Sequence, residues 1–268
     1  MSHKRKDGIT IYEKEDFEGM RKAGRLAAEC LDYITDYVQV GVSTGELGDL
    51  CRGLFSSRGG IPACLGYRGY PKSVCISINH VICHGIPDYE RKLVNGDILN
   101  IDVTCILDGW YGDTSRMYYA GEPKIKAKRL CDVTYECMMR GIDVVKPGAR
   151  FGDIGAVIEE YAHKYGYGVV DMFCGHGLGR VFHDSPNVMH VGKKGTGPVM
   201  EEGMFFTIEP MINIGKPDAI ILKDGWTSVT RDKTLSAQFE HSMGVTKDGV
   251  EVFTYSPKGL DRPPYKKA

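Results

Sequence analysis

The chain has 268 residues, of which 42% are hydrophobic and 26% charged, and 34 basic against 35 acidic residues give a net charge of −1. This composition is that of an ordinary globular protein of one or two domains, and the balanced charge gives no reason to expect nucleic-acid specificity. The nine cysteines are odd in number and never spaced C-x-x-C. That spacing argues against a disulfide framework or a cysteine zinc site and favours a reducing compartment.

The first twenty residues contain basic side chains but lack the apolar stretch of a secretory signal peptide. No run of about 18 apolar residues, the length that a membrane-spanning helix needs, occurs anywhere in the chain. We therefore expect a cytoplasmic protein with no membrane contact.

Two long amphipathic helices are predicted, because apolar residues recur at helical spacing over residues 16–38 and again over about 126–145. Each is followed by a glycine-led turn and a second helix. Setting Gly41 on Gly148 aligns GVSTGELGDL with GARFGDIGAV and pairs Glu46 with Asp153. This internal repeat predicts two similar halves that share one core.

Segments rich in Val, Ile, Tyr and Thr, which are typical of strands, follow the helical parts at residues 73–85, 97–120, 204–213 and 234–246. No Pro- or Ser-rich linker separates the halves. We expect one compact α/β (α+β) unit, a single domain over residues 11–256. A short N-terminal segment, 1–10, precedes it, and a loose tail, 257–268, follows it.

Asp102 and Asp113 lie on two predicted strands that are joined at Asp108-Gly109. A D-G turn between apolar alternations is a hairpin signal, and such a hairpin can bring both carboxylates to one face. Two carboxylates held together repel each other unless a cation lies between them. The alternative is that both are turn or edge acids on a solvated face.

The segment FCGHGLGRVFHD contains His176 between glycines and His183 seven residues later. Flanking glycines allow the backbone and a ligand to approach closely and leave the imidazole accessible. A core histidine with satisfied hydrogen bonds is the alternative interpretation.

Glu209 and Glu240 lie inside the apolar, strand-like runs FFTIEPM and LSAQFEHS. A buried carboxylate needs a cation, a proton or hydrogen-bond donors, so partnered structural glutamates are the alternative. Together the candidates offer two Asp, one His and two Glu, an oxygen-rich set that suits a pair of Mn²⁺, Fe²⁺, Co²⁺ or Zn²⁺ ions. His84 and His183 remain as auxiliary acid/base candidates.

From about Ile11 to Ser256 the chain resembles type I methionine aminopeptidases, through PACLGYRGYPKSVCISIN, CHGIPD, NGDILNIDVT, GDTSRM, CGHGLGR, FTIEPM and SAQFEH. The resemblance implies the pita-bread fold, two pseudo-symmetric half-repeats around a curved antiparallel sheet. It implies removal of the initiator methionine from nascent proteins and peptides with a small second residue, by dinuclear-metal hydrolysis with a bridging water or hydroxide nucleophile. The metal ligands it implies are Asp102, Asp113, His176, Glu209 and Glu240, with Asp113 and Glu240 bridging the ions.

The same resemblance implies roles for other side chains. Glu209 would shuttle a proton, His183 would bind the substrate carbonyl and the developing oxyanion, and His84 would contact the scissile amide nitrogen. An apolar pocket for the methionine side chain would be lined by Cys64, Tyr67, Tyr70, Cys75, Phe182 and Trp226. A monovalent cation, Na⁺ or K⁺, would be held by the backbone around Asn79 and Val81, with Ser236.

Glu209 and Glu240 are 31 residues apart, which leaves no room for the insertion of type II enzymes, and the short form resembles the bacterial enzymes. We expect a ribosome-associated monomer that acts on nascent N-termini. Arg68 and Tyr111 depart from the histidines expected there, near the ligand set. The competing hypotheses are an aminopeptidase P or prolidase-like peptidase, and a non-catalytic binding module on the same fold.

Overall fold

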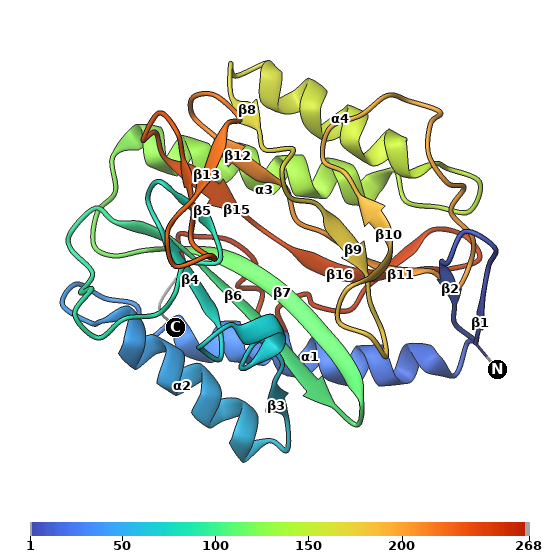
Figure 1. Cartoon of the computed structure of the whole chain (residues 1–268), viewed down its shortest axis with the longest axis horizontal. Helices are drawn as coiled ribbons and strands as arrows, with labels where there is room; N and C mark the ends of the chain where they lie inside the picture. The colour runs from blue at the N-terminus through green and yellow to red at the C-terminus, as the bar shows by residue number, and fades with distance from the viewer. Residues whose placement is uncertain (1, 266–268) are drawn as a thin grey trace.

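The computed structural model describes residues 2–265. Its helices form two pairs, as the internal repeat predicts. Figure 1 shows one pair along the lower edge of the molecule and the other along the upper edge, with the strands between them. The helices are α1 (Asp16–Ile34), α2 (Thr44–Ser57), α3 (Ile125–Asp143) and α4 (Phe151–His163), with a short 3-10 helix η1 (Tyr67–Gly69).

The repeat predicted from Gly41 and Gly148 is visible in the turns that lead into α2 and α4. Both glycines have left-handed backbones, with φ of 94° and 87°. In each half an acid three residues into the helix, Glu46 or Asp153, accepts a hydrogen bond from the backbone N–H of the N-cap residue. The prediction of two similar halves is confirmed by these matching turns and capping hydrogen bonds.

Antiparallel pairing dominates the strands, which lie in several small sheets. In the first half these strands are β3 (Ile61–Pro62), β4 (Cys75–Ile78), β5 (Val81–Cys83), β6 (Ile98–Leu107) and β7 (Trp110–Tyr119). In the second half they are β8 (Gly168–Val169), β9 (Gly175–Gly177), β10 (Asp184–Val188), β11 (Phe205–Ile208), β12 (Met211–Asn213), β13 (Ala219–Ile221), β14 (Ser228–Thr230), β15 (Ser236–Gln238), β16 (His241–Val245) and β17 (Val250–Val252).

The two halves join at the centre of the molecule, where β7 meets the end of β15 and the start of β16. Ser115 and Glu240 form an isolated antiparallel bridge, and the Thr114 hydroxyl donates to the Glu240 carbonyl at 2.7 Å. The Ser242 hydroxyl donates in turn to the carbonyl of Asp113 at 2.5 Å. Backbone positions of two candidate ligands are therefore fixed by contacts between the halves.

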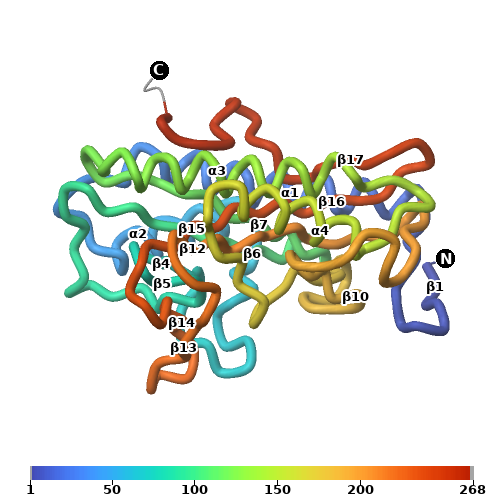
Figure 2. The backbone as a smooth tube through the Cα atoms, turned by 90° about the horizontal axis from the view of Figure 1, so that it is seen from above, coloured from blue at the N-terminus to red at the C-terminus, as the bar shows by residue number. Residues whose placement is uncertain are grey.

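Each half has its own apolar core, and a third cluster lies between them. One core packs under α1 and α2 and the other under α3 and α4. The cluster between them contains stacked and edge-on rings of Tyr12, Phe17, Trp110, Phe205 and Phe253. The helices cover one side of the strands. Figure 2 shows α1 and α3 along that side and the β13–β14 hairpin projecting from the opposite side, which is the side that faces the viewer in Figure 1.

The ends of the chain are packed against the body as far as they are described. Residues 2–10 include β1 (His3–Lys4), which pairs with β2 (Thr10–Ile11), and Ile9 is 2% exposed. No helix among the described residues is both long and apolar enough to cross a membrane.

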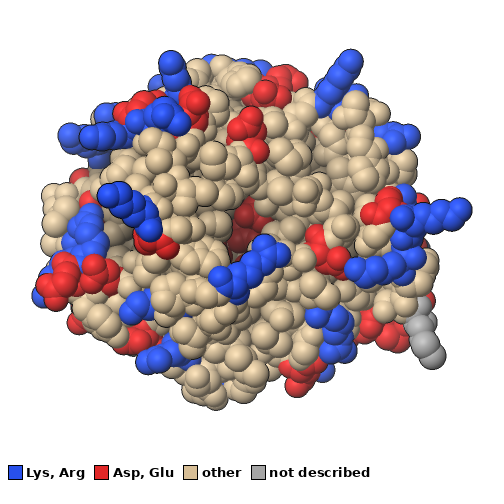
Figure 3. Space-filling model, viewed as in Figure 1, with Lys and Arg blue, Asp and Glu red and all other residues tan. Residues whose placement is uncertain are grey.

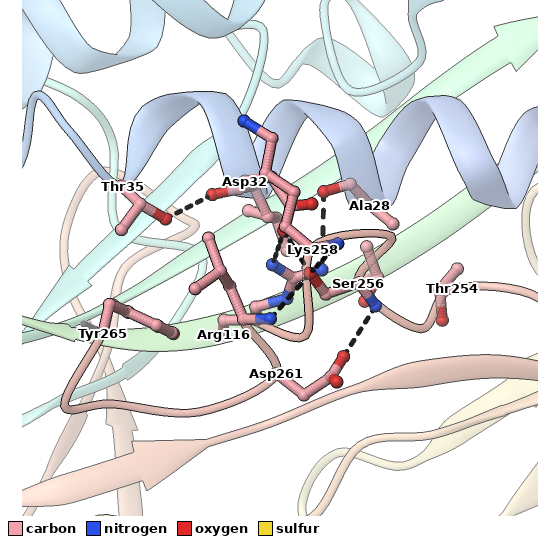
Figure 4. Close-up of polar contacts among 12 residues, drawn as sticks. Ala28, Asp32, Thr35, Arg116, Thr254, Ser256, Lys258, Asp261 and Tyr265 are labelled. Atoms are coloured by element: carbon pink, nitrogen blue, oxygen red, sulfur yellow. Dashed lines mark hydrogen bonds and ion pairs between the residues drawn. The ribbon is translucent and has the colours of Figure 1, made fainter. Parts of the chain in front are cut away.

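The expectation of a loose tail over 257–268 is wrong as far as Tyr265, and residues 266–268 lie outside the described part. Arg116 donates to the carboxylate of Asp32 at 2.6 Å in a fully buried ion pair. The Ser256 hydroxyl donates to the same oxygen at 2.7 Å (Figure 4). Within the tail itself, Tyr265 donates to the Met117 carbonyl of β7 at 2.8 Å and its ring centre lies 5.1 Å from that of Tyr118, so this end is packed against the first half.

Candidate metal centre

The β6–β7 hairpin holds Asp102 and Asp113 on one face, as the sequence predicts. Asp108 and Gly109 at its turn have φ of 52° and 78°, the backbone of a tight turn that suits twisted strands. Asp102 is opposite Ser115 and Asp113 is opposite Thr104, so the two acids are diagonal neighbours. The Thr104 hydroxyl donates to Oδ1 of Asp113 at 2.7 Å and leaves the second oxygen for another partner.

The second half supplies Glu209 and Glu240 to the same place. Glu240 is 2% exposed, directly beside β7, and Glu209 follows the end of β11. Oε1 of Glu209 accepts from the Thr207 hydroxyl at 2.7 Å, and Oε2 accepts from the side-chain amide of Gln238 at 3.3 Å. These donors fix the rotamer of Glu209 but supply no positive charge.

His176, on β9, presents a nitrogen lone pair to the carboxylates. Its Nδ1 is 3.0 Å from the carbonyl oxygen of Gly177, which can only accept, so Nδ1 carries the proton. Nε2 faces Oδ2 of Asp113 at 3.5 Å and Oε1 of Glu209 at 3.6 Å. A histidine held through one nitrogen by a carbonyl, with the other facing carboxylates, has the tautomer of a metal ligand.

Asp113, His176 and Glu240 each place one possible ligand atom within 4.8 Å of the others, and all three are buried. Asp102 and Glu209 line the same cavity. The structure thus brings together all five ligand candidates. Figure 3 shows the hollow on the open face, with acidic atoms at its bottom.

The electrostatics of this cluster favour a cation. Burial and the neighbouring carboxylates raise the pKa of Asp102 and of Glu240 well above their usual values. Burial likewise raises the pKa of Glu209 to about 7. Although burial lowers the pKa of His176, the carboxylates of Asp113 and Glu209 outweigh it and raise that pKa. Three acids whose raised pKa values reflect a lack of nearby positive charge fit divalent ions, which would supply that charge.

The acids line one side of an open cavity of about 310 Å³, and the residues of the expected apolar pocket line the rest of its wall. The Tyr67 and Phe182 rings are 4.7 Å apart, and the Tyr70 and Trp226 rings meet edge-on at 5.1 Å. All six residues expected in the pocket line this space: Cys64, Tyr67, Tyr70, Cys75, Phe182 and Trp226.

His84 and His183 line the cavity next to the acids. Nδ1 of His183 is 2.8 Å from the Tyr67 hydroxyl, and its ring centre is 4.2 Å from that of His176. Burial lowers the pKa of His183 to about 3 and also lowers the pKa of His84. Both rings are therefore neutral at pH 7, available to hydrogen-bond a substrate.

The residues expected around a monovalent cation also lie together. Asn79 has a left-handed backbone with φ of 56°, and its carbonyl accepts from the Ser236 N–H at 2.8 Å. The Ser236 hydroxyl oxygen is buried without a hydrogen-bond partner among the described residues. Val81 is opposite Val229 on the neighbouring strand.

Several residues at the site were not anticipated from the sequence. Thr104 lies two residues from Asp102, and Thr207 lies two residues from Glu209. Because side chains two residues apart point to the same face of a strand, this spacing could have predicted both threonines. His190, which binds the backbone of Glu209, had no such signal. Arg68 lines the cavity and Tyr111 stacks on Phe182 at 5.4 Å, so both lie near the ligand set, as expected. Further lining residues are Cys83, Met172, Phe173, Cys174, Met211 and Gln238.

Comparison with known proteins identifies the family of the chain. Residues 18–247 match the model of metallopeptidase family M24. The chain belongs to metallopeptidase family M24. All five ligand candidates of this M24 chain lie within the matched residues.

Among its relatives, the methionine aminopeptidase of Rickettsia prowazekii is 62% identical over 258 residues, or 96% of this chain and 99% of that protein. That of Escherichia coli K12 is 51% identical over 247 residues, or 92% and 94% of the two chains. The crystal structure of the Rickettsia prowazekii methionine aminopeptidase superposes with a TM-score of 0.91 at 61% identity, covering 92% of this M24 chain and 99% of that one. The expected pita-bread fold is confirmed.

Proposed function

We propose that this metallopeptidase removes the N-terminal methionine from nascent proteins and peptides whose second residue is small. The observation that carries the proposal is the largely apolar cavity that four carboxylates and one imidazole line on one side, three of them, Asp113, His176 and Glu240, buried and close together. Relatives named methionine aminopeptidase, at 62% and 51% identity over nearly the whole chain, support it.

The donor set fits two divalent ions, which Asp102, Asp113, His176, Glu209 and Glu240 would hold. When bound, such ions lower the pKa of a coordinated water and polarise the scissile carbonyl. Oxygen donors with a single imidazole suit Co²⁺, Mn²⁺, Fe²⁺ or Zn²⁺.

The side chains around the ions have separate roles in the proposed reaction. Glu209, whose pKa burial raises to about 7, suits a group that accepts and returns a proton near neutral pH. His183, oriented by Tyr67, hydrogen-bonds the substrate carbonyl and the charge that develops on its oxygen. His84 contacts the scissile amide nitrogen.

The cavity wall suits a thioether. Aromatic rings and the sulfur atoms of Cys64 and Cys75 offer polarisable contacts to an unbranched apolar side chain. In this proposal the methionine side chain fills the cavity, and the crowded metal centre admits only a small second residue.

We also propose that the backbone around Asn79 and Val81, with the Ser236 hydroxyl, holds Na⁺ or K⁺. The unpartnered buried oxygen of Ser236 supports this assignment. The enzyme would act in the cytoplasm as a monomer, close to the ribosome, where nascent N-termini emerge.

The test is hydrolysis of Met-X peptides by metal-stripped protein to which single divalent ions are added back, with X varied from Gly and Ala to Leu and Glu. Cleavage only with metal and only for small X is expected. Norleucine at the first position should be tolerated, since an apolar pocket distinguishes methylene-sized differences by only about 1–3 kcal/mol. Equal cleavage across X, or a requirement for Pro at the second position, would instead indicate a broad or prolidase-like peptidase. Metal binding without any hydrolysis would indicate a binding module.

A further inference from the structure

Arg68 is held at the mouth of the cavity by a constrained turn. It lies in η1 between Gly66 and Gly69, and its own backbone is left-handed, with φ of 49°. The turn is closed by backbone hydrogen bonds from Tyr70 to Tyr67 at 2.9 Å and from Gly66 to Tyr70 at 2.8 Å. The side chain is exposed yet lines the same cavity as the acids.

The guanidinium of Arg68 has no acidic partner in the described part of the chain. Its Cζ lies 5.3 Å from the centre of the Tyr67 ring, and no carboxylate of residues 2–265 forms an ion pair with it. Tyr67 is the residue that orients His183. Arg68 therefore stands beside the candidate metal centre with its hydrogen-bond donors unused by residues 2–265.

Among the described residues that line the cavity, Arg68 is also the only Lys or Arg. The other formal charges there belong to Asp102, Asp113, Glu209 and Glu240, and two divalent ions would neutralise these four carboxylates. One positive charge would then remain, at the mouth. Figure 3 shows acidic atoms deep in the hollow and a basic side chain across its margin.

We propose that Arg68 binds an acidic side chain at the third or fourth residue of the substrate. The inference rests on the proposed function, which places the first side chain in the cavity and the second residue at the metal centre. The third and fourth residues are the next to leave the cavity, at about 3.3 Å of extended chain per residue, and the exposed lining residue Arg68 is placed to meet them. A guanidinium with free donors matches a carboxylate better than any neutral side chain.

The experiment compares Met-Ala peptides that carry Glu, Gln or Lys at the third or fourth position, with Glu at the eighth position as the distance control. The expected result is a kcat/KM about two- to fivefold higher for Glu than for Lys at the near positions, the range of exposed ion pairs, expressed mainly in KM. The ratio should fall toward one in 0.5 M NaCl. Arg68→Gln should abolish it, and Arg68→Glu should invert it.

Arg58→Gln and Arg58→Glu make the same charge changes at an exposed arginine that does not line the cavity. They should leave the Glu-to-Lys ratio unchanged, and thermal unfolding shows whether each variant is folded. A ratio that persists in folded Arg68→Gln, or that changes equally in the Arg58 variants, overturns the inference. Loss of cleavage of the neutral Gln peptide by Arg68→Gln also overturns it, because Arg68 would then be needed for the cleavage of every substrate. Failure of wild-type protein on every Met-Ala peptide would instead refute the proposed function.

Discussion

Nε2 of His190 accepts a hydrogen bond of 3.1 Å from the backbone N–H of Glu209. His190 is fully buried, and burial lowers its pKa to about 3, so the ring is neutral. Because Nε2 accepts, Nδ1 carries the proton, and Nδ1 has no partner among the described residues. The protein thus holds an incompletely satisfied imidazole in its interior against the backbone of a candidate ligand.

We predict that His190→Ala destabilises the protein and slows catalysis together. The variant leaves the Glu209 N–H unpaired and opens a void, which together should lower the free energy of unfolding by about 2–4 kcal/mol. His190→Gln should recover part of both losses, since its amide oxygen can accept. Urea unfolding of metal-free protein and kcat/KM are the two measurements.

His163→Ala serves as the control, because His163 is exposed at the end of α4. It should leave both quantities within error of the wild type. Wild-type stability and rate in His190→Ala would show that this hydrogen bond does not position Glu209.

A second prediction concerns metal content. Asp113→Asn removes a negative charge beside His176 and should reduce bound divalent metal below two ions per chain, with a loss of activity of at least about 10²-fold. The matched control is Asp108→Asn, the same change on the same hairpin at an exposed turn residue whose left-handed backbone suits asparagine. Elemental analysis after dialysis and calorimetric titration with Mn²⁺ measure the effect. If Asp113→Asn retained two ions, Asp113 would not be a ligand.

A third prediction separates His183 from the metal ligands. His183→Ala should keep its metal while kcat falls by about 10²- to 10⁴-fold, the range for a positioned acid/base group or hydrogen-bond donor. Tyr67→Phe removes the 2.8 Å partner of Nδ1, and it should lower kcat by a smaller factor, about two- to tenfold. Loss of metal along with rate in His183→Ala would make His183 a ligand instead.

The parts of the site that follow from local pattern were predictable from the sequence. Strand alternation and the Asp108-Gly109 turn suffice to put Asp102 and Asp113 on one face. The repeat around Gly41 and Gly148 predicted paired helical turns with matching acids.

What local pattern does not determine is which distant strands meet. His176, Glu209 and Glu240 were weak candidates singly. Their chemistry grouped them with Asp102 and Asp113 as one oxygen-rich donor set, and the resemblance to a family then assigned them as ligands. The contact between His190 and Glu209, 19 residues apart, depends on how β10 and β11 pack. The periodicity of the sequence does not predict this packing. The tail was misjudged for a similar reason, because the partners of Tyr265, the Met117 carbonyl and the Tyr118 ring on β7, are distant in the sequence.

The last prediction concerns the acid at the start of α4 and its effect on stability at low pH. Asp153 accepts backbone hydrogen bonds from Arg150 at 2.8 Å and from Gly195 at 2.7 Å, and these bonds hold its pKa below the usual value. A carboxyl group whose pKa is lowered by folding stabilises the protein above its unfolded pKa, near 3.9, and this contribution is lost as the pH falls through the folded value.

Asp153→Ala should therefore lower the free energy of unfolding at pH 7 by about 1 kcal/mol, the usual effect of losing a helix cap. The difference in free energy of unfolding between the variant and the wild type should narrow as the pH falls below about 4. Protonation of Asp153 then removes from the wild type the stabilisation by the ionised carboxylate that the variant already lacks. Urea unfolding of metal-free protein from pH 7 to pH 3 measures the gap. Asp248→Ala is the control, since the Asp248 side chain is 79% exposed and its change should have little effect at either end of the range. A gap for Asp153→Ala that stayed constant down to pH 3 would mean that the variant loses packing rather than hydrogen bonds to a carboxylate.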